Sequence, residues 1–188
     1  MFSILFLALL AVGLFYGVVT FNGLVALKHN VAKAWSNIDV LLKQRHDELP
    51  KLVETCKQYM KYEQDTLEKV MLARSQVANA RESHDVNALG AAESSMRAGL
   101  GKLFALAEAY PELKANEQFL HLQGRITGLE NAISDRREFY NESVNINNVR
   151  IEQFPSNIFA GIFNFKAADL FKVSEADTAD VDMKKAFG

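Results

Sequence analysis

The chain has 188 residues, of which 49% are hydrophobic and 23% are charged, and its formal net charge is −2. This near balance of charge, without a basic stripe interleaved with aromatic side chains, argues against nucleic acid as a partner. The single cysteine, Cys56, excludes a disulfide within the chain and is compatible with a reducing compartment. Few glycines and only three prolines interrupt the chain, which favours long helices over sheets.

The first 27 residues contain no charged side chain, and Lys28 is the first charged residue. About 20 apolar helical residues cross the roughly 30 Å hydrocarbon core of a bilayer, so we expect a membrane-spanning anchor over residues 1–23. A cleaved secretory signal is the alternative, but no Lys or Arg precedes the run and no small-x-small cleavage site follows it. A buried core helix is a third interpretation, and it requires a large core around the helix.

The flanks of the apolar run predict its orientation. Lys28, His29 and Lys33 follow the run, so the positive-inside tendency predicts an outside N-terminus and a cytoplasmic C-terminal body. Within the run, Gly13 and Gly17 form a small-xxx-small pair, which predicts a contact face between transmembrane helices. The alternative is that glycine is simply common in such helices.

After the anchor, apolar residues recur at spacings of three and four from Leu24 to Val77. This pattern is typical of a helix packed against other helices. We expect the anchor to continue without a break into this helix, which reaches about Ala78. Pro50 lies inside it and cannot donate a hydrogen bond to the carbonyl of His46, so we expect a kink there.

Two further helices are expected in the body of the chain. Asp85 or Ser83 is predicted to cap a second helix that stops near Pro111. Asn116 is predicted to start a third, which runs to about Glu152 because a Phe-Pro pair follows it. The predicted fold class is all-α: one N-terminal transmembrane helix continuing into an antiparallel bundle of three long helices, with a short C-terminal helical segment.

The stretch 156–165 is aromatic-rich and uncharged. We expect it either to fold back onto the bundle or to contact another chain or a membrane. Its predicted contact residues are Ile158, Phe159, Ile162, Phe163 and Phe165. The expected organisation is then an anchor at 1–23, a helical bundle at 24–173 and a polar tail at 174–188.

Charged residues interrupt the apolar seams, meaning the inward-facing positions of the predicted helices. They are Arg45, Glu63, Glu93 and Arg136. A charge at such a position costs stability unless it is paired, so we expect buried or half-buried ion pairs, with a polar site for a small ligand or metal as the alternative. Other carboxylates and the histidines are expected to face solvent: Asp39, Asp47, Glu130 and Asp135, with His29, His46, His84 and His121.

The sequence offers no recognisable reaction chemistry. It lacks the Glu-x-x-His pattern that di-iron helical bundles use. Cys56 has no Cys-x-x-Cys partner and is predicted to fill a small space in a seam. We therefore predict no catalytic residue, no cofactor and no metal site.

Seven stretches of the chain resemble the LemA family in their order and spacing. They are FNGLV at 21–25, AWSNIDV at 34–40, RHDELPKLV at 45–53, YPELKAN at 110–116, LENAI at 129–133, FYN at 139–141 and FPSN at 154–157. Phe21 stands where the family usually has Tyr, and Glu48 where it has an apolar residue. The resemblance implies a single-pass protein of the bacterial inner membrane with a cytoplasmic helical bundle and no established enzymatic reaction. A magnetosome-forming branch of the family suggests a role in shaping or organising membranes.

These observations lead to three hypotheses for function. The first is a non-enzymatic, membrane-anchored scaffold that self-assembles and organises or shapes membrane, with membrane lipid and further copies of itself as partners. The second is a membrane-bound adaptor for another membrane protein, such as a protease or transporter. The third, an enzyme or metal protein, requires stoichiometric metal or an ordered ligand between the helices.

Overall fold

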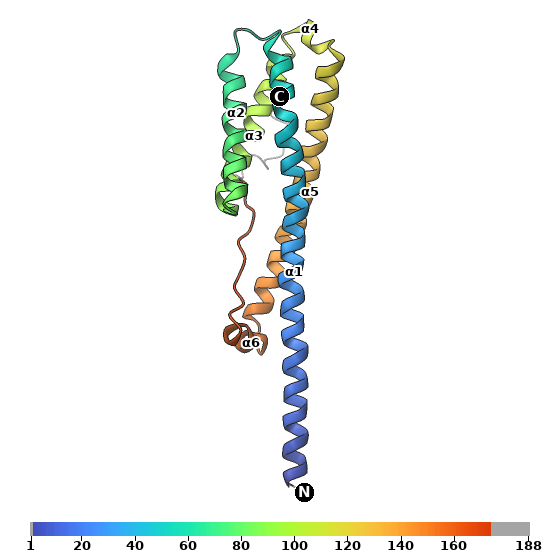
Figure 1. Ribbon diagram of the computed structural model, residues 1–188, viewed down its shortest axis with the longest axis vertical. Coiled ribbons are helices and arrows are strands. Elements are labelled where there is room, and N and C mark those ends of the chain that lie inside the picture. Colours follow the sequence, from blue (N-terminus) through green and yellow to red (C-terminus); the bar gives the residue numbers. More distant parts are fainter. Residues whose placement is uncertain (1, 174–188) are drawn as a thin grey trace, which may run out of the picture. The chain divides into compact units, whose positions relative to one another are not determined.

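The computed structural model of the protein describes residues 2–173, and these form an all-α structure (Figure 1). The helices are α1 (Phe2–Lys57), α2 (Gln64–Glu82), α3 (Val86–Ala107), α4 (Pro111–Lys114), α5 (Glu117–Glu152) and α6 (Ser156–Ile162). The predicted fold class is thus confirmed. The predicted polar tail at 174–188 lies outside the described residues, and the division into anchor, bundle and tail stays a prediction.

The chain divides into two compact units, and α1 and α5 each contribute to both. The anchor unit comprises residues 2–38 and 135–170, which include the first part of α1, the last part of α5 and α6. The bundle unit comprises residues 39–134 and, after the anchor unit, residues 171–173. It contains the end of α1, the start of α5, and the whole of α2, α3 and α4.

The bundle unit is antiparallel, because the chain reverses direction after α1, after α2 and after α3 (Figure 1). Apolar residues of the predicted seams fill its interior, and burying each large side chain stabilises the fold by about 1.5–3 kcal/mol. The wholly buried ones include Leu49, Leu52, Leu89, Met96, Leu103, Phe119 and Ile126. Close packing extends to Gly90 of α3, where an added Cβ would stand 1.9 Å from the carbonyl oxygen of Lys172.

The first long helix ends earlier than the sequence predicts. We expected it to reach about Ala78, but α1 ends at Lys57 and a turn over residues 58–63 leads into α2. Within this turn Met60 is buried, and its amide donates to the carbonyl of Cys56 at 2.8 Å. The reversal lets the apolar face of α2 pack against α3, whereas a straight continuation would leave that face in water. Tertiary packing therefore replaces one predicted helix with two.

The α1 helix continues through Pro50, and the structure supplies the hydrogen bond that proline removes. A proline has no N–H, so the carbonyl four residues earlier, at His46, loses its helical donor. Arg74 of α2 takes that place: its Nε donates to the His46 carbonyl oxygen at 2.9 Å. The side chain of α2 thereby satisfies a backbone group that the sequence of α1 leaves open.

The predicted helix starts in the bundle unit are confirmed by their caps. The carboxylate of Asp85 accepts a hydrogen bond from the amide of Ala88 at 2.9 Å at the start of α3. The side-chain oxygen of Asn116 accepts from the amide of Phe119 at 2.9 Å, just before α5 begins. Each cap satisfies one of the backbone donors that a helix N-terminus leaves without a partner.

In the anchor unit, the segment after α6 is held against α5. The side chain of Asn148 donates to the carbonyl of Ala168 at 2.9 Å and accepts from the amide of the same residue at 2.9 Å. The hydroxyl of Tyr140 donates to the carbonyl of Asp169 at 3.0 Å, and the Tyr140 ring packs edge-on against Trp35 of α1. These contacts fix the returning chain on the same unit as the apolar start of α1.

Candidate functional site

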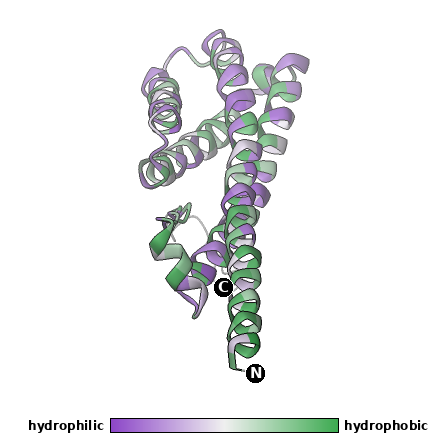
Figure 2. Cartoon of the chain, turned by 60° about the horizontal axis from the view of Figure 1, so that its bottom comes forward, coloured by the Kyte–Doolittle hydropathy of each residue, from purple (hydrophilic) through white to green (hydrophobic). Residues whose placement is uncertain are grey.

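The N-terminal part of α1 is largely apolar and carries no charge, and Figure 2 shows it mostly green with a few pale bands. In the part of the chain that the structure describes, α1 is the one helix long and apolar enough to cross a membrane. Its side chains are exposed along this stretch, from Phe2 to Val19. A helix that is apolar all round and left uncovered by its own fold is not a core helix, and it needs another apolar environment.

The short helix α6 lies against this apolar stretch. The ring of Phe159 packs on Gly17, where an added Cβ would stand 3.1 Å from ring atom Cε1, and it also approaches the ring of Tyr16. Beyond the end of α6, Phe163 makes an edge-on contact with Phe21 at a centroid distance of 4.7 Å. Aromatic pairs in this geometry add to the stabilisation from apolar burial. The uncharged segment that the sequence left with two possible placements therefore folds back onto the anchor unit.

The five predicted contact residues divide between two faces. Phe159 and Phe165 are half-buried and face α1, since the Phe165 ring also lies edge-on to Phe21. Phe163 contacts Phe21 of α1 but keeps 53% of its surface accessible, whereas Ile158 and Ile162, at 51% and 69% exposed, lie on the outer face. An exposed apolar face on an uncharged helix needs an explanation beyond the packing of this chain.

The two glycines of the predicted pair, Gly13 and Gly17, have different surroundings in the structure. Gly17 is already covered by the ring of Phe159, whereas an added Cβ at Gly13 would meet nothing within 4 Å. Of the two glycines, only Gly13 presents an open surface. Association of anchors through this pair stays a prediction.

A charged cluster lies inside the bundle unit. Arg45 of α1 is 1% exposed, and its guanidinium forms ion pairs with Glu93 of α3 and Glu130 of α5. One of these bonds, from Arg45 Nη1 to Glu93 Oε2, measures 3.0 Å. Burial alone lowers the pKa of Arg45, but the two carboxylates outweigh burial and hold that pKa above its ordinary value. The cluster links three helices by charge-assisted hydrogen bonds.

Two of the four predicted seam charges lie elsewhere. Glu63 is half-exposed and directly precedes α2, because the predicted helix is interrupted at this point. Arg136 is exposed, because the packed face of α5 passes through Ile133 and Tyr140 and leaves Arg136 outside it. Glu130, expected to face solvent, is the partner that the sequence analysis missed. Its position directly after the seam residue Leu129 was the available signal.

Other predicted positions take structural roles. His46 is half-buried, and its ring nitrogen Nε2 lies 2.6 Å from Nη2 of Arg74. Burial and then the Arg74 charge lower the pKa of His46, so the neutral ring accepts this bond. Cys56 is buried, which raises the pKa of its thiol to about 12 and keeps it protonated.

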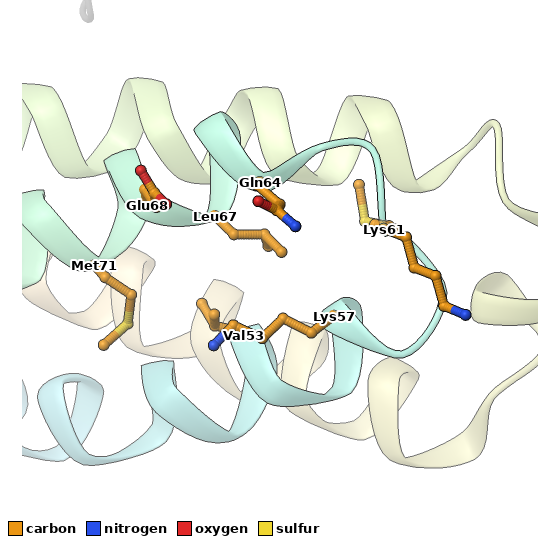
Figure 3. Close-up of a pocket in the computed structure, with 8 residues that line it drawn as sticks. Val53, Lys57, Lys61, Gln64, Leu67, Glu68 and Met71 are labelled. Carbon is orange, nitrogen blue, oxygen red and sulfur yellow. The ribbon is translucent and has the colours of Figure 1, made fainter.

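A cavity of about 530 Å³ opens near the turn between α1 and α2 (Figure 3). Its apolar lining includes Val53 and Leu67, and Lys57 and Lys61 also line it. Within residues 2–173, no group of three or more His, Cys, Asp or Glu side chains is arranged to hold a metal ion. The features that stand out are therefore the apolar first part of α1 with α6 against it, a buried ionic cluster and this cavity.

Together these features define a membrane-associated, all-α protein with one long apolar N-terminal helix. Residues 34–184 match the LemA family, and the chain belongs to that family. The chain is 30% identical over 188 residues to Protein LemA of Metamycoplasma hominis, a match that covers 96% of this chain and 82% of that protein. The family resemblance drawn from the sequence is thereby confirmed.

A second group of relatives carries the name of the magnetosome. The chain is 30% identical over 100 residues to Magnetosome protein MamQ 2 of Paramagnetospirillum magneticum. It is 28% identical over 100 residues to Magnetosome protein MamQ of Magnetospirillum gryphiswaldense. Each match covers 53% of this chain and 37% of the relative, so the chain spans little more than a third of these proteins.

Proposed function

We propose that this protein is a non-enzymatic, membrane-anchored scaffold that self-assembles and organises or shapes the bilayer. The observation that carries the proposal is the docking of α6 on the uncharged part of α1, with the remaining apolar face of α6 exposed. The names of the magnetosome relatives are consistent with a role at membranes. In this proposal the partners of the protein are membrane lipid and further copies of the same protein.

The position of α6 along the anchor explains how it would act on lipid. It contacts α1 at Tyr16 and Gly17, and Phe163 directly after it contacts Phe21, towards the end of a run of about 20 residues that spans the hydrocarbon core. An uncharged helix at that depth buries its apolar face at the boundary between headgroups and acyl chains. A second element inserted beside the anchor occupies area in one leaflet only, and this asymmetry favours a particular lipid order or curvature.

The orientation follows from the charges that flank the anchor. Lys28, His29 and Lys33 lie directly after the uncharged run. Under the positive-inside tendency the bundle unit is cytoplasmic, the N-terminus is outside and the membrane is the bacterial inner membrane. The leaflet that receives α6 is then the cytoplasmic one.

Self-assembly is supported by an unpartnered apolar stripe on α5. Phe139, Ile146 and Val149 are 42–55% exposed. Residues separated by seven and ten positions fall within about 80° of one helix face at 100° per residue. The stripe fits the equivalent stripe of a second copy, and the open Gly13 of the anchor offers a further contact in the membrane.

Two measurements on the full-length protein test the scaffold. Light scattering in detergent gives the mass of the assembly, and electron microscopy of reconstituted vesicles gives their shape. We expect Phe139→Gln with Ile146→Gln to lower the mass. We expect Ile158→Gln with Ile162→Gln to leave the mass unchanged and abolish the effect on vesicle shape.

The matched control is Leu72→Gln, which removes an exposed apolar side chain of the bundle unit. It should alter neither the mass nor the vesicles. A monomeric wild-type protein that leaves vesicle shape unchanged would contradict the scaffold.

The adaptor function is the alternative, and the cavity at the α1–α2 turn favours it. Its apolar lining, with two lysines and one glutamate, Glu68, suits an apolar side chain beside an acidic residue on a partner protein. Cross-linking from Lys61→Cys in native membranes would then give one defined product, which Leu67→Gln would remove. Absence of that product, together with a large homo-oligomer, would favour the scaffold.

A further inference from the structure

A pocket of about 520 Å³ lies in the anchor unit, between α1, α5 and the stretch that follows α6. One wall is apolar and is formed by Phe21, Val25, Phe163 and Phe165. The edge-on contacts of Phe21 with Phe163 and Phe165 hold this wall together. The pocket is therefore built by the packing of α1 against the returning chain rather than by one mobile side chain.

The rest of the lining is polar and basic. Lys28 and His29 of α1, Lys166 of the stretch after α6 and the amide side chain of Asn147 also line the pocket. Asn147 is only 4% exposed, and its amide donates to Oδ1 of Asn148 at 3.2 Å. The lining residues that the structure describes include no aspartate or glutamate. A ligand in this pocket thus has both basic side chains and an aromatic wall within reach.

We propose that this pocket binds an anionic phospholipid, with its phosphate between Lys28 and Lys166 and its glycerol and upper acyl carbons against Phe21 and Phe163. The proposal rests on the proposed membrane anchoring and adds the identity of the lipid partner. Two lysines that converge from different segments provide point charges for a phosphate group. The aromatic wall matches the part of a lipid that lies just below its headgroup.

The spacing along α1 agrees with the dimensions of a bilayer. Phe21 and Lys28 are seven residues apart, which is about 10 Å along a helix. The headgroup region on each side of the hydrocarbon core is about 5–8 Å thick. The pocket therefore crosses the zone in which a lipid changes from acyl chain to phosphate.

Free phosphate is also an anion but gains nothing from the aromatic wall. Phosphatidylcholine can use the wall but brings a cationic choline next to the lysines. An anionic phospholipid can use the lysines through its phosphate and the aromatic wall through its acyl carbons. The three ligands can therefore be separated by experiment.

The test is native mass spectrometry of the full-length protein in detergent, with phosphatidylglycerol and phosphatidylcholine of equal chain length added in equal amounts. We expect at least ten-fold more bound phosphatidylglycerol. Lys28→Gln with Lys166→Gln should weaken its binding about 25-fold, at about five-fold per lysine near a membrane surface. The control Lys33→Gln with Lys43→Gln removes the same charge outside the pocket, and we expect less than a two-fold change.

Three results would overturn the lipid site: equal binding of the two lipids by the wild-type protein, an equal loss in the control, or displacement of phosphatidylglycerol by the same concentration of inorganic phosphate. Circular dichroism of both variants shows whether the helices are intact, and Phe163→Ala tests the apolar wall without any change of charge. The native mass spectra also give the oligomeric mass. A monomer that still binds phosphatidylglycerol through Lys28 and Lys166 would contradict the scaffold and leave the lipid site standing.

Discussion

The ring of Phe159 lies so close to the backbone of Gly17 that a Cβ at Gly17 would stand 3.1 Å from ring atom Cε1. The absence of a side chain at Gly17 therefore lets α6 sit directly on the anchor. Gly13, one turn earlier, has open space where its Cβ would be. The two glycines form a matched pair for testing the docking of α6.

We expect Gly17→Leu to displace α6 from α1, because the leucine side chain would occupy the space of the Phe159 ring. Hydrogen exchange of the amides in residues 156–163, measured in lipid nanodiscs, should become at least ten-fold faster. Gly13→Leu should leave this exchange unchanged, whatever it does to the association of anchors. Equal exchange in the wild type and in Gly17→Leu would show that α6 does not depend on this contact.

Arg45→Met tests the buried cluster. It leaves Glu93, with 5% of its side chain exposed, without its cation. We expect a loss of about 3–5 kcal/mol in the free energy of unfolding, measured by denaturant titration. Adding Glu93→Leu should recover most of this loss, while Lys51→Met, which breaks the exposed pair with Glu48 at 3.3 Å, should cost less than about 1 kcal/mol. A small effect of Arg45→Met alone would contradict the structural role of the cluster.

We expect the hydrogen bond from Arg74 to the His46 carbonyl to stabilise the fold, because Pro50 has no N–H to donate to that carbonyl. Arg74→Met should therefore cost about 1 kcal/mol in the free energy of unfolding. In a Pro50→Ala background the new amide can donate to the same carbonyl, so the cost of Arg74→Met should be smaller by about 0.5 kcal/mol or more. Additive effects in this double-mutant cycle would show that the two donors do not replace one another.

The stability of the bundle unit should fall in mild acid because of His46. Burial and then Arg74 lower the pKa of His46, Arg81 acts in the same direction, and Asp47 and Glu82 oppose them. The unfolded chain, with an imidazole pKa of about 6.5, therefore binds the proton more readily than the folded chain. The contribution of neutral His46 is fully present above pH about 6.5 and is lost as the pH falls below that value.

The measurement is the free energy of unfolding between pH 7.5 and pH 5.5. We expect His46→Gln to reduce the loss of stability over this range, because its amide oxygen can accept from Arg74 and does not titrate. His121→Gln changes an exposed histidine and should keep the wild-type slope. Parallel curves for the wild type and His46→Gln would contradict the role assigned to the neutral ring.

Local signals in the sequence were enough to place most helix ends. The caps at Asp85 and Asn116 and the Phe-Pro pair after Glu152 act within a few residues, and the structure has helix boundaries at these points. The turn over residues 58–63 contains no glycine or proline, and the spacing of apolar residues continues through it. After the reversal α2 packs on α3 and bonds to α1 through Arg74 and His46, and these contacts cannot be derived from local spacing.

The sequence predicted the candidate sites only in part, because their contacts also depend on how distant helices pack. Arg45 and Glu93 stand out because each interrupts an apolar seam, and the structure brings them together. Glu130 lies one position from a seam, so its inward direction depends on how α5 packs against α1 and α3. The contact of Phe159 with Gly17 joins residues more than 140 positions apart, and the sequence leaves open whether the segment folds back or meets another surface.

The central claim is that α6 lies in the membrane beside the apolar part of α1. Measuring the depth of α6 in the bilayer tests this claim most directly. In a Trp35→Phe background, Phe163→Trp places one fluorophore directly after α6, and the protein is reconstituted into vesicles that contain brominated lipids. The account predicts strong quenching by bromine on the upper acyl chain and weak quenching by iodide in the water. Strong quenching by iodide with none by the brominated chains would place α6 outside the bilayer and contradict the account.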